Sequence, residues 1–445
     1  MKRIITMALC IILCISLCSC GMKNNTNNTN QSNKTGSLTL WGSADDQNML
    51  SDMVSAFRKA GEDIAEIGVK VTGEDVAANE ALKDVDAAAD VYAISHDSLG
   101  SLVEAGAIYE ITGTRLSNIK ESVSSSALSA ATYNGKVYGF PSSSETYLMY
   151  YDKSIYTEAE VKLLETMLDK KLADGVYNFG MNFSEGYYGS SFFFTAGCTL
   201  YGENGDDATK CDFNNDDGVA AAKYIKKLGT MNVINCDESE ALSLMKSGKL
   251  AAYVTGPWKS ENMKDALGTN YGVCALPTVD IKGNGDNRQL KSFSGYKIYV
   301  VNSATSDPET AMKLAEHLTN EENQKKRFTT RAMLPVHTKV AALDEVVKDE
   351  TVAATLDQLN NSVPMPAVSQ VSKYWTAFAA FSEDCFNGKI ADSDIKSKLD
   401  SLVNQAISQT TNNSSSNSSS KSSSQATHNA SSNVSSQVSS QAASK

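Results

Sequence analysis

The sequence is poor in histidine and lacks any closely spaced pair of cysteines. Its four histidines, His96, His317, His337 and His428, stand far apart, and no two have the spacing of metal ligands. The C-x-x-C pattern of thioredoxin-like and zinc-ribbon sites is absent. The sequence therefore argues against a zinc enzyme, and we expect neither a metal nor a cofactor.

Basic residues are also fewer than acidic ones. The chain has 40 Lys and Arg and 52 Asp and Glu, so its net charge is −12. Nucleic acids and anionic lipids both require a basic face, so neither is an expected partner. A length of 445 residues with 41% hydrophobic and 21% charged residues is ordinary for a globular protein of two or three domains.

The two ends of the chain do not have core-forming patterns. Residues 1–19 are expected to be a signal peptide, because Lys2 and Arg3 precede an apolar run from Ile4 to Leu17 that is too short to cross a bilayer stably. A retained anchor helix is the alternative, and the polar residues that close the run argue against it. Residues 20–36 are nearly all polar and indicate a flexible tether, and residues 408–445 form a Ser-rich tail without periodicity.

The segment Leu17-Cys18-Ser19-Cys20-Gly21 resembles the lipobox of bacterial lipoproteins. In that family a small residue precedes a cysteine that is lipidated and becomes the new N-terminus. The resemblance implies a lipid anchor on Cys20, by which the protein would be held at the extracellular face of the cell membrane. We expect no other contact with the membrane.

Five cysteines lie in the body of the chain. Cys198 and Cys211 flank a segment rich in Gly, Asn and Asp that is typical of a hairpin turn, so a disulfide across the hairpin is one prediction. The alternative is that all five, which also include Cys236, Cys274 and Cys385, are small buried apolar residues.

Between the two ends, strand and helix patterns alternate. Residues 37–42 and 90–94 read as strands, and Met49, Leu50, Met53, Val54 and Phe57 recur at helical spacing. A helix is also predicted near 158–173, and apolar stripes predict two late helices over 371–385 and 392–407. This order predicts an α/β fold with parallel sheets.

In this order the segments resemble the lipoprotein solute-binding proteins of sugar ABC importers, and most closely the maltose/maltodextrin-binding group. The resemblance covers about 37–407 and is strongest in SLTLWGSADDQ at 37–47, VYGFPSSSETYLMYYDKS at 137–154, VTGPWKSENM at 254–263 and SFSGYKIYVVNSAT at 292–305. It implies a two-lobed periplasmic-binding-protein-like fold with a hinge and a central cleft. The implied N-terminal lobe is 37–142 plus 296–345, and the C-terminal lobe is 143–293 plus 350–407.

The family resemblance also implies a set of sugar-binding aromatics in the second lobe. Trp258, in Gly-Pro-Trp after a strand, matches a stacking tryptophan, with packing in a turn as the alternative. Trp375 lies one position off an apolar helical stripe, which would turn its ring toward the cleft and not the core. Tyr187 and Tyr188, after Glu185, match a Glu-x-aromatic position of the family. One ring of the pair should stack on the sugar and the other should pack in the lobe, and the sequence does not show which is which. Flat rings suit the apolar faces of a sugar.

Four carboxylates are the candidate partners of sugar hydroxyls: Asp45, Asp97, Glu145 and Glu185. For Asp97 and Asp45 the alternative role is to cap the helices that follow them. Trp41 is predicted to pack in a core and His96 to make a structural hydrogen bond. Three positions depart from the family pattern: Ile94 and Ser98 stand where an aromatic and an arginine are usual, and Asp46 stands where a lysine is usual. A cleft with fewer stacking planes and fewer cationic donors on the first lobe is therefore expected.

The leading hypothesis is a non-enzymatic, monomeric, lipid-anchored protein that captures an oligosaccharide, preferably a malto-oligosaccharide, and delivers it to an ABC transporter permease. A surface adhesin for polysaccharide is the alternative that the Ser-rich tail favours. A glycoside hydrolase would need two of these carboxylates about 5–10 Å apart across a glycosidic bond, and nothing in the sequence pairs them.

Overall fold

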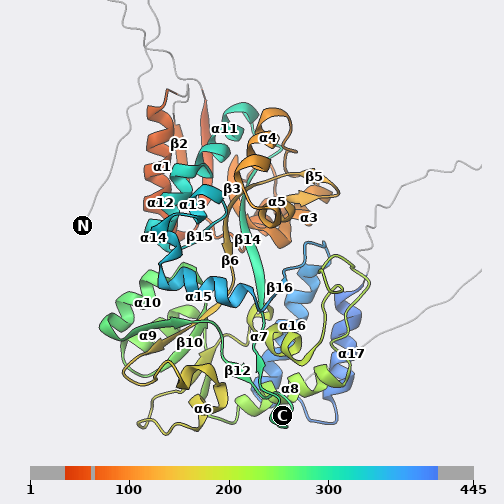
Figure 1. Ribbon diagram of the computed structural model, residues 1–445. Coiled ribbons are helices and arrows are strands. Elements are labelled where there is room, and N and C mark those ends of the chain that lie inside the picture. The colour runs from red at the N-terminus through yellow and green to blue at the C-terminus, as the bar shows by residue number, and fades with distance from the viewer. Residues whose placement is uncertain (1–35, 62–65, 409–445) are drawn as a thin grey trace, which may run out of the picture. The chain divides into compact units, whose positions relative to one another are not determined.

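The computed structural model describes residues 36–61 and 66–408 (Figure 1). The predicted signal peptide, Cys20, nearly all of the tether and the Ser-rich tail after residue 408 lie outside the described residues. Within the described residues, no helix combines the length and the apolar character needed to span a membrane.

The first sheet has seven strands among the described residues, in the order β15-β6-β14-β3-β1-β2, with β16 paired to β14. The strands are β1 (Ser37–Gly42), β2 (Glu66–Val71), β3 (Val91–Ser95), β6 (Phe140–Glu145), β14 (Ser292–Val301), β15 (Leu334–Pro335) and β16 (Ser362–Pro364). We call this sheet and the helices that pack on it the first lobe. These helices are α1 (Gln47–Lys59), α2 (Ala77–Lys83), α3 (Leu99–Glu104), α4 (Gly113–Ser122), α5 (Ser125–Ala130), α11 (Pro308–Leu318), α12 (Glu321–Arg331), α13 (Thr338–Ala341) and α14 (Asp344–Val347).

The second sheet has the order β11-β7-β10-β8-β9. Its strands are β7 (Leu148–Asp152), β8 (Phe179–Met181), β9 (Val233–Asn235), β10 (Ala252–Thr255) and β11 (Tyr271–Cys274). With its helices it forms the second lobe. These helices are α6 (Leu164–Asp169), α7 (Gly186–Ala196), α8 (Asp216–Leu228), α9 (Glu238–Lys246), α10 (Ser260–Leu267), α15 (Glu350–Leu359), α16 (Val371–Phe386) and α17 (Ile395–Ala406). Two short hairpins, β4 (Thr132–Tyr133) with β5 (Lys136–Val137) and β12 (Thr278–Val279) with β13 (Arg288–Gln289), complete the strands.

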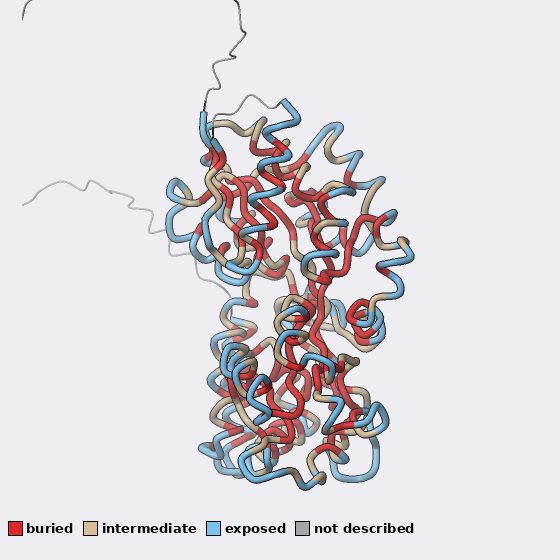
Figure 2. Tube along the Cα trace, turned by 90° about the vertical axis from the view of Figure 1, so that its left-hand side faces the viewer, coloured by how far each residue is buried: buried red, intermediate tan, exposed pale blue. Residues whose placement is uncertain are grey.

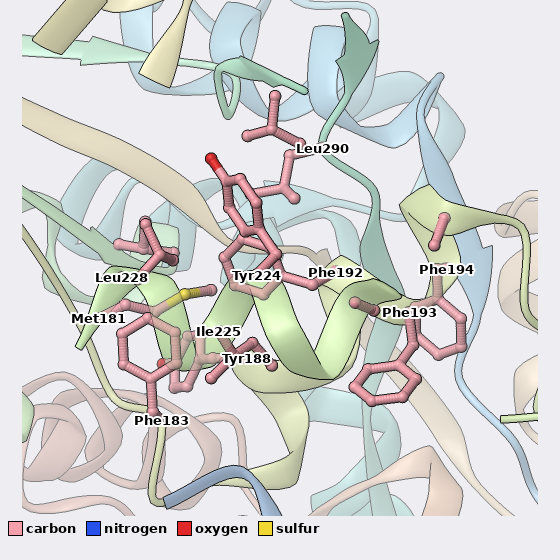
Figure 3. Close-up of a cluster of buried hydrophobic side chains, with 14 of the residues drawn as sticks. Met181, Phe183, Tyr188, Phe192, Phe193, Phe194, Tyr224, Ile225, Leu228 and Leu290 are labelled. Atoms are coloured by element: carbon pink, nitrogen blue, oxygen red, sulfur yellow. The ribbon is translucent and has the colours of Figure 1, made fainter. Parts of the chain in front are cut away.

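Each lobe has its own apolar core, and Figure 2 shows buried residues in both halves and along the segments that join them. In the first core, all five apolar residues that predicted a helix after β1 are buried on α1. The second core is rich in aromatic rings, several of which, including Phe192, Phe193 and Phe194, are carried by α7 itself (Figure 3). Burial on nearly every side suits α7, whose residues are almost all apolar or small.

The chain passes between the lobes along β14, which runs through both groups of elements in Figure 1. Residues 292–294 of β14 pair with β16 beside the second core, which contains Phe293, and residues 295–301 pair with β6 and β3 of the first sheet. A second passage follows β6, where the Thr146 hydroxyl donates a hydrogen bond to the Phe293 carbonyl at 2.8 Å. The two crossing segments are thereby joined to each other at the floor of the region between the lobes.

The α/β class is confirmed, but the prediction of parallel sheets is wrong. β14 is antiparallel to both β3 and β6, and β7 is antiparallel to β10 and β11. Both sheets are mixed because strands that arrive from the other lobe enter them in the opposite direction. The helix predicted near 158–173 is present but much shorter, since the chain there forms a short 3-10 turn followed by α6.

The predicted disulfide between Cys198 and Cys211 is absent, and both thiols are free. The hairpin itself forms, but Leu200 is the residue that pairs with Cys211 across it. Cys198 therefore lies two positions out of register, and its thiol contacts Asn215 instead. The two late helices are as predicted, because their apolar stripes, Cys385 included, are buried.

Candidate functional site

A cavity of about 990 Å³ lies between the two lobes and is lined by residues of both. Its first-lobe wall comes from segments that follow strand ends, since Asp45 follows β1 and Asp97 follows β3. Its second-lobe wall comes from the start of α7, the start of α9, the turn after β10 and the first half of α16. Because the carboxyl ends of strands meet at one edge of a sheet, residues from distant parts of the chain converge here.

All eight residues that the sequence predicted to bind sugar line this cavity: Asp45, Asp97, Glu145, Glu185, Tyr187, Tyr188, Trp258 and Trp375. The five from the second lobe include all four aromatic rings. Asp45 and Asp97 come from the first lobe, and Glu145 ends β6 at the crossing between the lobes. The four predicted rings therefore all lie on the second-lobe side, whereas carboxylates line the cavity on both sides. That these groups bind sugar stays a prediction.

The Trp258 ring is held from two sides within its own lobe. Its indole nitrogen donates a hydrogen bond to Glu238 Oε1 at 2.7 Å. The six-membered part of the ring lies against Gly256, where a Cβ atom would come within 1.9 Å of the indole. Only glycine fits at 256 with this ring orientation, so the Gly-Pro-Trp sequence fixes the ring as well as the turn. Trp258 remains half-buried, with surface left toward the cavity.

Trp375 and Asp97 meet across the cavity. The Trp375 indole donates a hydrogen bond to Asp97 Oδ2 at 3.1 Å, while Asp97 Oδ1 is buried without a partner in the protein. Capping of the following helix, the alternative role of Asp97, is not seen, because Ser98 precedes α3 and makes no side-chain cap. Burial raises the pKa of the Asp97 carboxyl, and the hydrogen bond from Trp375 opposes that rise.

The two tyrosines on the first turn of α7 have different surroundings. Tyr188 is buried at 3% exposure in the aromatic core, and its hydroxyl lies 3.4 Å from Glu238. Tyr187 is only partly buried, stacks on Phe293 with ring centroids 5.9 Å apart and has a hydroxyl without a partner in the protein. Tyr187 is therefore the better candidate for contact with a ligand, and Tyr188 the better candidate for packing.

Glu145 forms a buried ion pair at the floor of the cavity. Its Oε1 lies 3.1 Å from Lys297 Nζ, and its Oε2 is buried without a partner. The neighbouring Ser143 hydroxyl is also buried and unpartnered. Burial alone would lower the pKa of Lys297, but Glu145, Glu74 and Asp97 outweigh it and raise the pKa. The site thus keeps a charged ammonium group beside carboxylate oxygens that are free to accept hydrogen bonds.

The expectation that the first lobe has fewer cationic donors than the family pattern stays a prediction, but basic side chains of this lobe are present at the cavity. Lys297 on β14, and Arg327 and Arg331 on α12, all line the cavity. Asp46 accepts a hydrogen bond from Arg327 Nη1 at 3.1 Å and forms an ion pair with Arg331, whose Nε lies 3.0 Å from Oδ1. These basic residues lie about 250–290 positions after the first strand, so no motif near Asp46 could reveal them.

Within the described part of the chain, three side-chain contacts join the lobes around the cavity. Besides the bond between Trp375 and Asp97, Lys259 Nζ lies 3.1 Å from Asp45 Oδ2. Arg331 of the first lobe donates to the carbonyl of Trp258 in the second lobe at 3.0 Å. Asp45 therefore forms ion pairs with both lobes, in place of its alternative role as a helix cap.

His96 and Trp41 occupy the structural roles predicted for them. His96 Nδ1 accepts a hydrogen bond from the Tyr296 amide at 3.2 Å, and burial lowers the pKa of His96 to about 4, so the ring is neutral at physiological pH. Trp41 packs on the first core, 5.6 Å from Tyr92 between ring centroids. Among the described residues, no group of three or more His, Cys, Asp or Glu side chains is arranged to hold a metal ion.

We expect Glu185→Gln to stabilise the protein at pH 8 more than at pH 4.5. Partial burial, together with the nearby carboxylates Glu238, Asp75 and Asp237, raises the pKa of Glu185 from 4.5 to about 7. Between pH 4.5 and about pH 7 the folded state therefore binds more protons than the unfolded state. The contribution of Glu185 to the free energy of unfolding falls as the pH rises through this range. Thermal unfolding at pH 4.5, 6 and 8 measures the effect, with Glu322→Gln on the exposed side of α12 as the control. Equal shifts at all three pH values would contradict it.

Known proteins are similar to this chain in both sequence and fold. The sequence profile of the family described as "Bacterial extracellular solute-binding protein" matches residues 52–354. The galactooligosaccharide-binding protein of Bacillus subtilis (strain 168) is 30% identical over 90% of this chain and 95% of its own length. A maltooligosaccharide ABC transporter solute-binding lipoprotein of Streptococcus pneumoniae (strain ATCC BAA-255 / R6) is 26% identical over 87% of this chain and 93% of its own length.

Among solved structures, the maltodextrin-binding protein of L. casei BL23, determined without ligand, is 29% identical and superposes with a TM-score of 0.72. The match covers 84% of this chain and 100% of that chain. The periplasmic-binding-protein-like fold that the sequence predicted is thereby confirmed.

Proposed function

Because the chain belongs to the family of bacterial extracellular solute-binding proteins, we propose that it captures an oligosaccharide between its lobes and delivers it to an ABC transporter permease. The proposed ligand is a malto-oligosaccharide, in keeping with the names of two of the similar proteins. We further propose that Cys20 carries the lipid anchor at the extracellular face of the cell membrane. The lipobox-like sequence supports this, as does the similarity to a protein named as a lipoprotein.

The observation that carries the proposal is the opposition of flat rings to unpartnered acidic oxygens across one cavity. Trp258 and Tyr187 offer faces for the apolar side of a sugar ring. Asp97 Oδ1 and Glu145 Oε2 are buried acceptors that lack a donor in the protein. Sugar hydroxyls are donors that fit them, and leaving such a group unpaired costs about 1–3 kcal/mol.

Ligand capture would work by a shift between open and closed arrangements of the lobes. A ligand favours the closed form only by the contacts that it makes better in that form than in the open one. The rings belong to the second lobe and Asp97 to the first, so a sugar that touches both gains most when the lobes are close. The chain crosses between the lobes along β14 and after β6, which makes these segments the natural hinge for such a motion.

Isothermal titration against a panel of glycans tests the proposal. The panel contains maltotriose to maltoheptaose, β-linked galacto-oligosaccharides, amino acids and peptides. We expect the malto-oligosaccharides to bind most tightly. A preference for galacto-oligosaccharides would change the assigned sugar while keeping the class, and would agree with the name of the B. subtilis protein. Binding to amino acids or peptides, with none to any glycan, would overturn the class.

The same panel separates the proposed role from an enzyme and from an adhesin. We expect labelled maltoheptaose to remain intact during incubation, because the role proposed for the cavity carboxylates is to accept hydroxyl hydrogen bonds. The appearance of shorter products would favour a glycoside hydrolase. Tighter binding to insoluble starch than to maltotriose would favour a surface adhesin.

A further inference from the structure

We propose that Glu238 is the positioning residue that holds the Trp258 ring in the orientation needed to stack on a sugar. The inference rests on the proposed function, because it assumes that Trp258 contacts the ligand. Glu238 is the first residue of α9, whereas Trp258 lies in the turn after β10. No pattern in the sequence connects the two positions.

One carboxylate oxygen of Glu238 accepts hydrogen bonds from three side chains. Glu238 Oε1 accepts from the Trp258 indole nitrogen at 2.7 Å, from the Thr255 hydroxyl, and from the Tyr188 hydroxyl at 3.4 Å. Its other oxygen, Oε2, lies 3.4 Å from Lys259 Nζ. Thr255 is fully buried and Tyr188 nearly so, so the carboxylate is fixed by groups that belong to the rigid part of the lobe.

The same contacts restrict the motion of the indole. With its N–H group directed at Glu238 and its six-membered ring against Gly256, the ring cannot turn about its bond to Cβ without losing the hydrogen bond or colliding with the backbone. A ring held in place before the ligand arrives does not lose rotamer freedom on binding. Glu238 therefore raises affinity through Trp258, without itself needing to touch the sugar.

The binding test compares three substitutions by titration with the malto-oligosaccharide that binds the natural chain best. Glu238→Leu removes every acceptor, and we expect affinity to fall about tenfold, the low end of the value for a hydrogen bond to a charged group. Glu238→Gln loses the charge but keeps an oxygen for the indole, so we expect affinity within about threefold of the natural chain. Glu240→Leu, on the exposed side of the same helix, is the control and should bind like the natural chain.

A double-mutant cycle with Trp258→Ala separates failure of this inference from failure of the proposed function. We expect Glu238→Leu to have no further effect on affinity once Trp258 is absent. If Trp258→Ala alone leaves affinity unchanged, the stacking role within the proposed function is wrong. If Trp258→Ala weakens binding but Glu238→Leu does not, or if the two effects add fully, the inference about Glu238 is wrong.

Fluorescence supplies a readout that needs no ligand. In a chain with Trp41→Phe and Trp375→Phe, Trp258 is the single remaining tryptophan. We expect Glu238→Leu to increase quenching of its emission by acrylamide and to lower its anisotropy, and Glu238→Gln to restore both. Unchanged anisotropy in Glu238→Leu would overturn the positioning role even if affinity fell, and urea unfolding of each variant verifies that it is folded.

Discussion

Alanine at both Trp258 and Trp375 is expected to lower affinity for the malto-oligosaccharide about 300-fold. Both rings line the cavity, and neither is completely buried by its own lobe. Covering one face of an aromatic ring with a sugar removes apolar surface worth about 1.5–2 kcal/mol per ring. Two rings then supply about 3–4 kcal/mol, and each 1.4 kcal/mol is a factor of ten in the dissociation constant. Isothermal titration of the two single variants and the double variant measures this.

Trp41→Ala is the matched control, because Trp41 is the third tryptophan of the chain and packs against Tyr92 on the first core. It should lower thermal stability and leave affinity unchanged. The Trp375 variant has an additional consequence, since it removes the hydrogen bond to Asp97 across the cavity. A double variant that binds within fivefold of the natural chain would mean that the rings are not the ligand's main apolar contact.

Local patterns in the sequence predicted those parts of the fold in which one face of an element is buried. α1, α16 and α17 each have a single apolar stripe, and the stripe residues are the buried ones. α7 escaped prediction by this route because it is buried on nearly all sides, so its sequence GYYGSSFFFTA has no polar face. Only the family resemblance at Glu185 singled out Tyr187 and Tyr188, which lie in its first turn.

The sequence predicts site residues that follow a strand or stand in a family motif. It does not predict residues that reach the site only through packing between distant parts of the chain. Asp97 follows a predicted strand, and Trp258 stands in the Gly-Pro-Trp segment that contributes to the family resemblance. Arg327 and Arg331 lie on a helix whose sequence, EENQKKRFTTR, indicates an exposed polar helix. Both arginines are nevertheless turned inward, because Asp46 from the other end of the chain supplies the charge that allows their burial.

This arrangement makes Asp46 a residue whose loss should strongly reduce stability. Asp46 is 4% exposed and Arg327 is 4% exposed, so the pair is shielded from water. Arg327 also donates to the Tyr299 hydroxyl at 2.9 Å, which holds the guanidinium in place when its anion is removed. Removing one partner of a buried ion pair leaves an uncompensated charge, at a cost of about 3–5 kcal/mol. We expect Asp46→Asn to lower the free energy of unfolding by this amount.

Urea unfolding followed by circular dichroism measures the change, and Asp45→Asn is the matched control. The two aspartates are adjacent, but the Asp45 side chain is 36% exposed and its ion pairs with Lys259 and Arg331 face the cavity. A pair of that kind contributes about 0–1 kcal/mol, so Asp45→Asn should be nearly neutral in the absence of ligand. Asp46→Lys, which restores the residue usual in the maltodextrin-binding group, should be the most destabilising of the three, because it places a third cation beside two guanidinium groups. If Asp46→Asn and Asp45→Asn had equal effects, the buried network would not be the source of the stability that we assign to it.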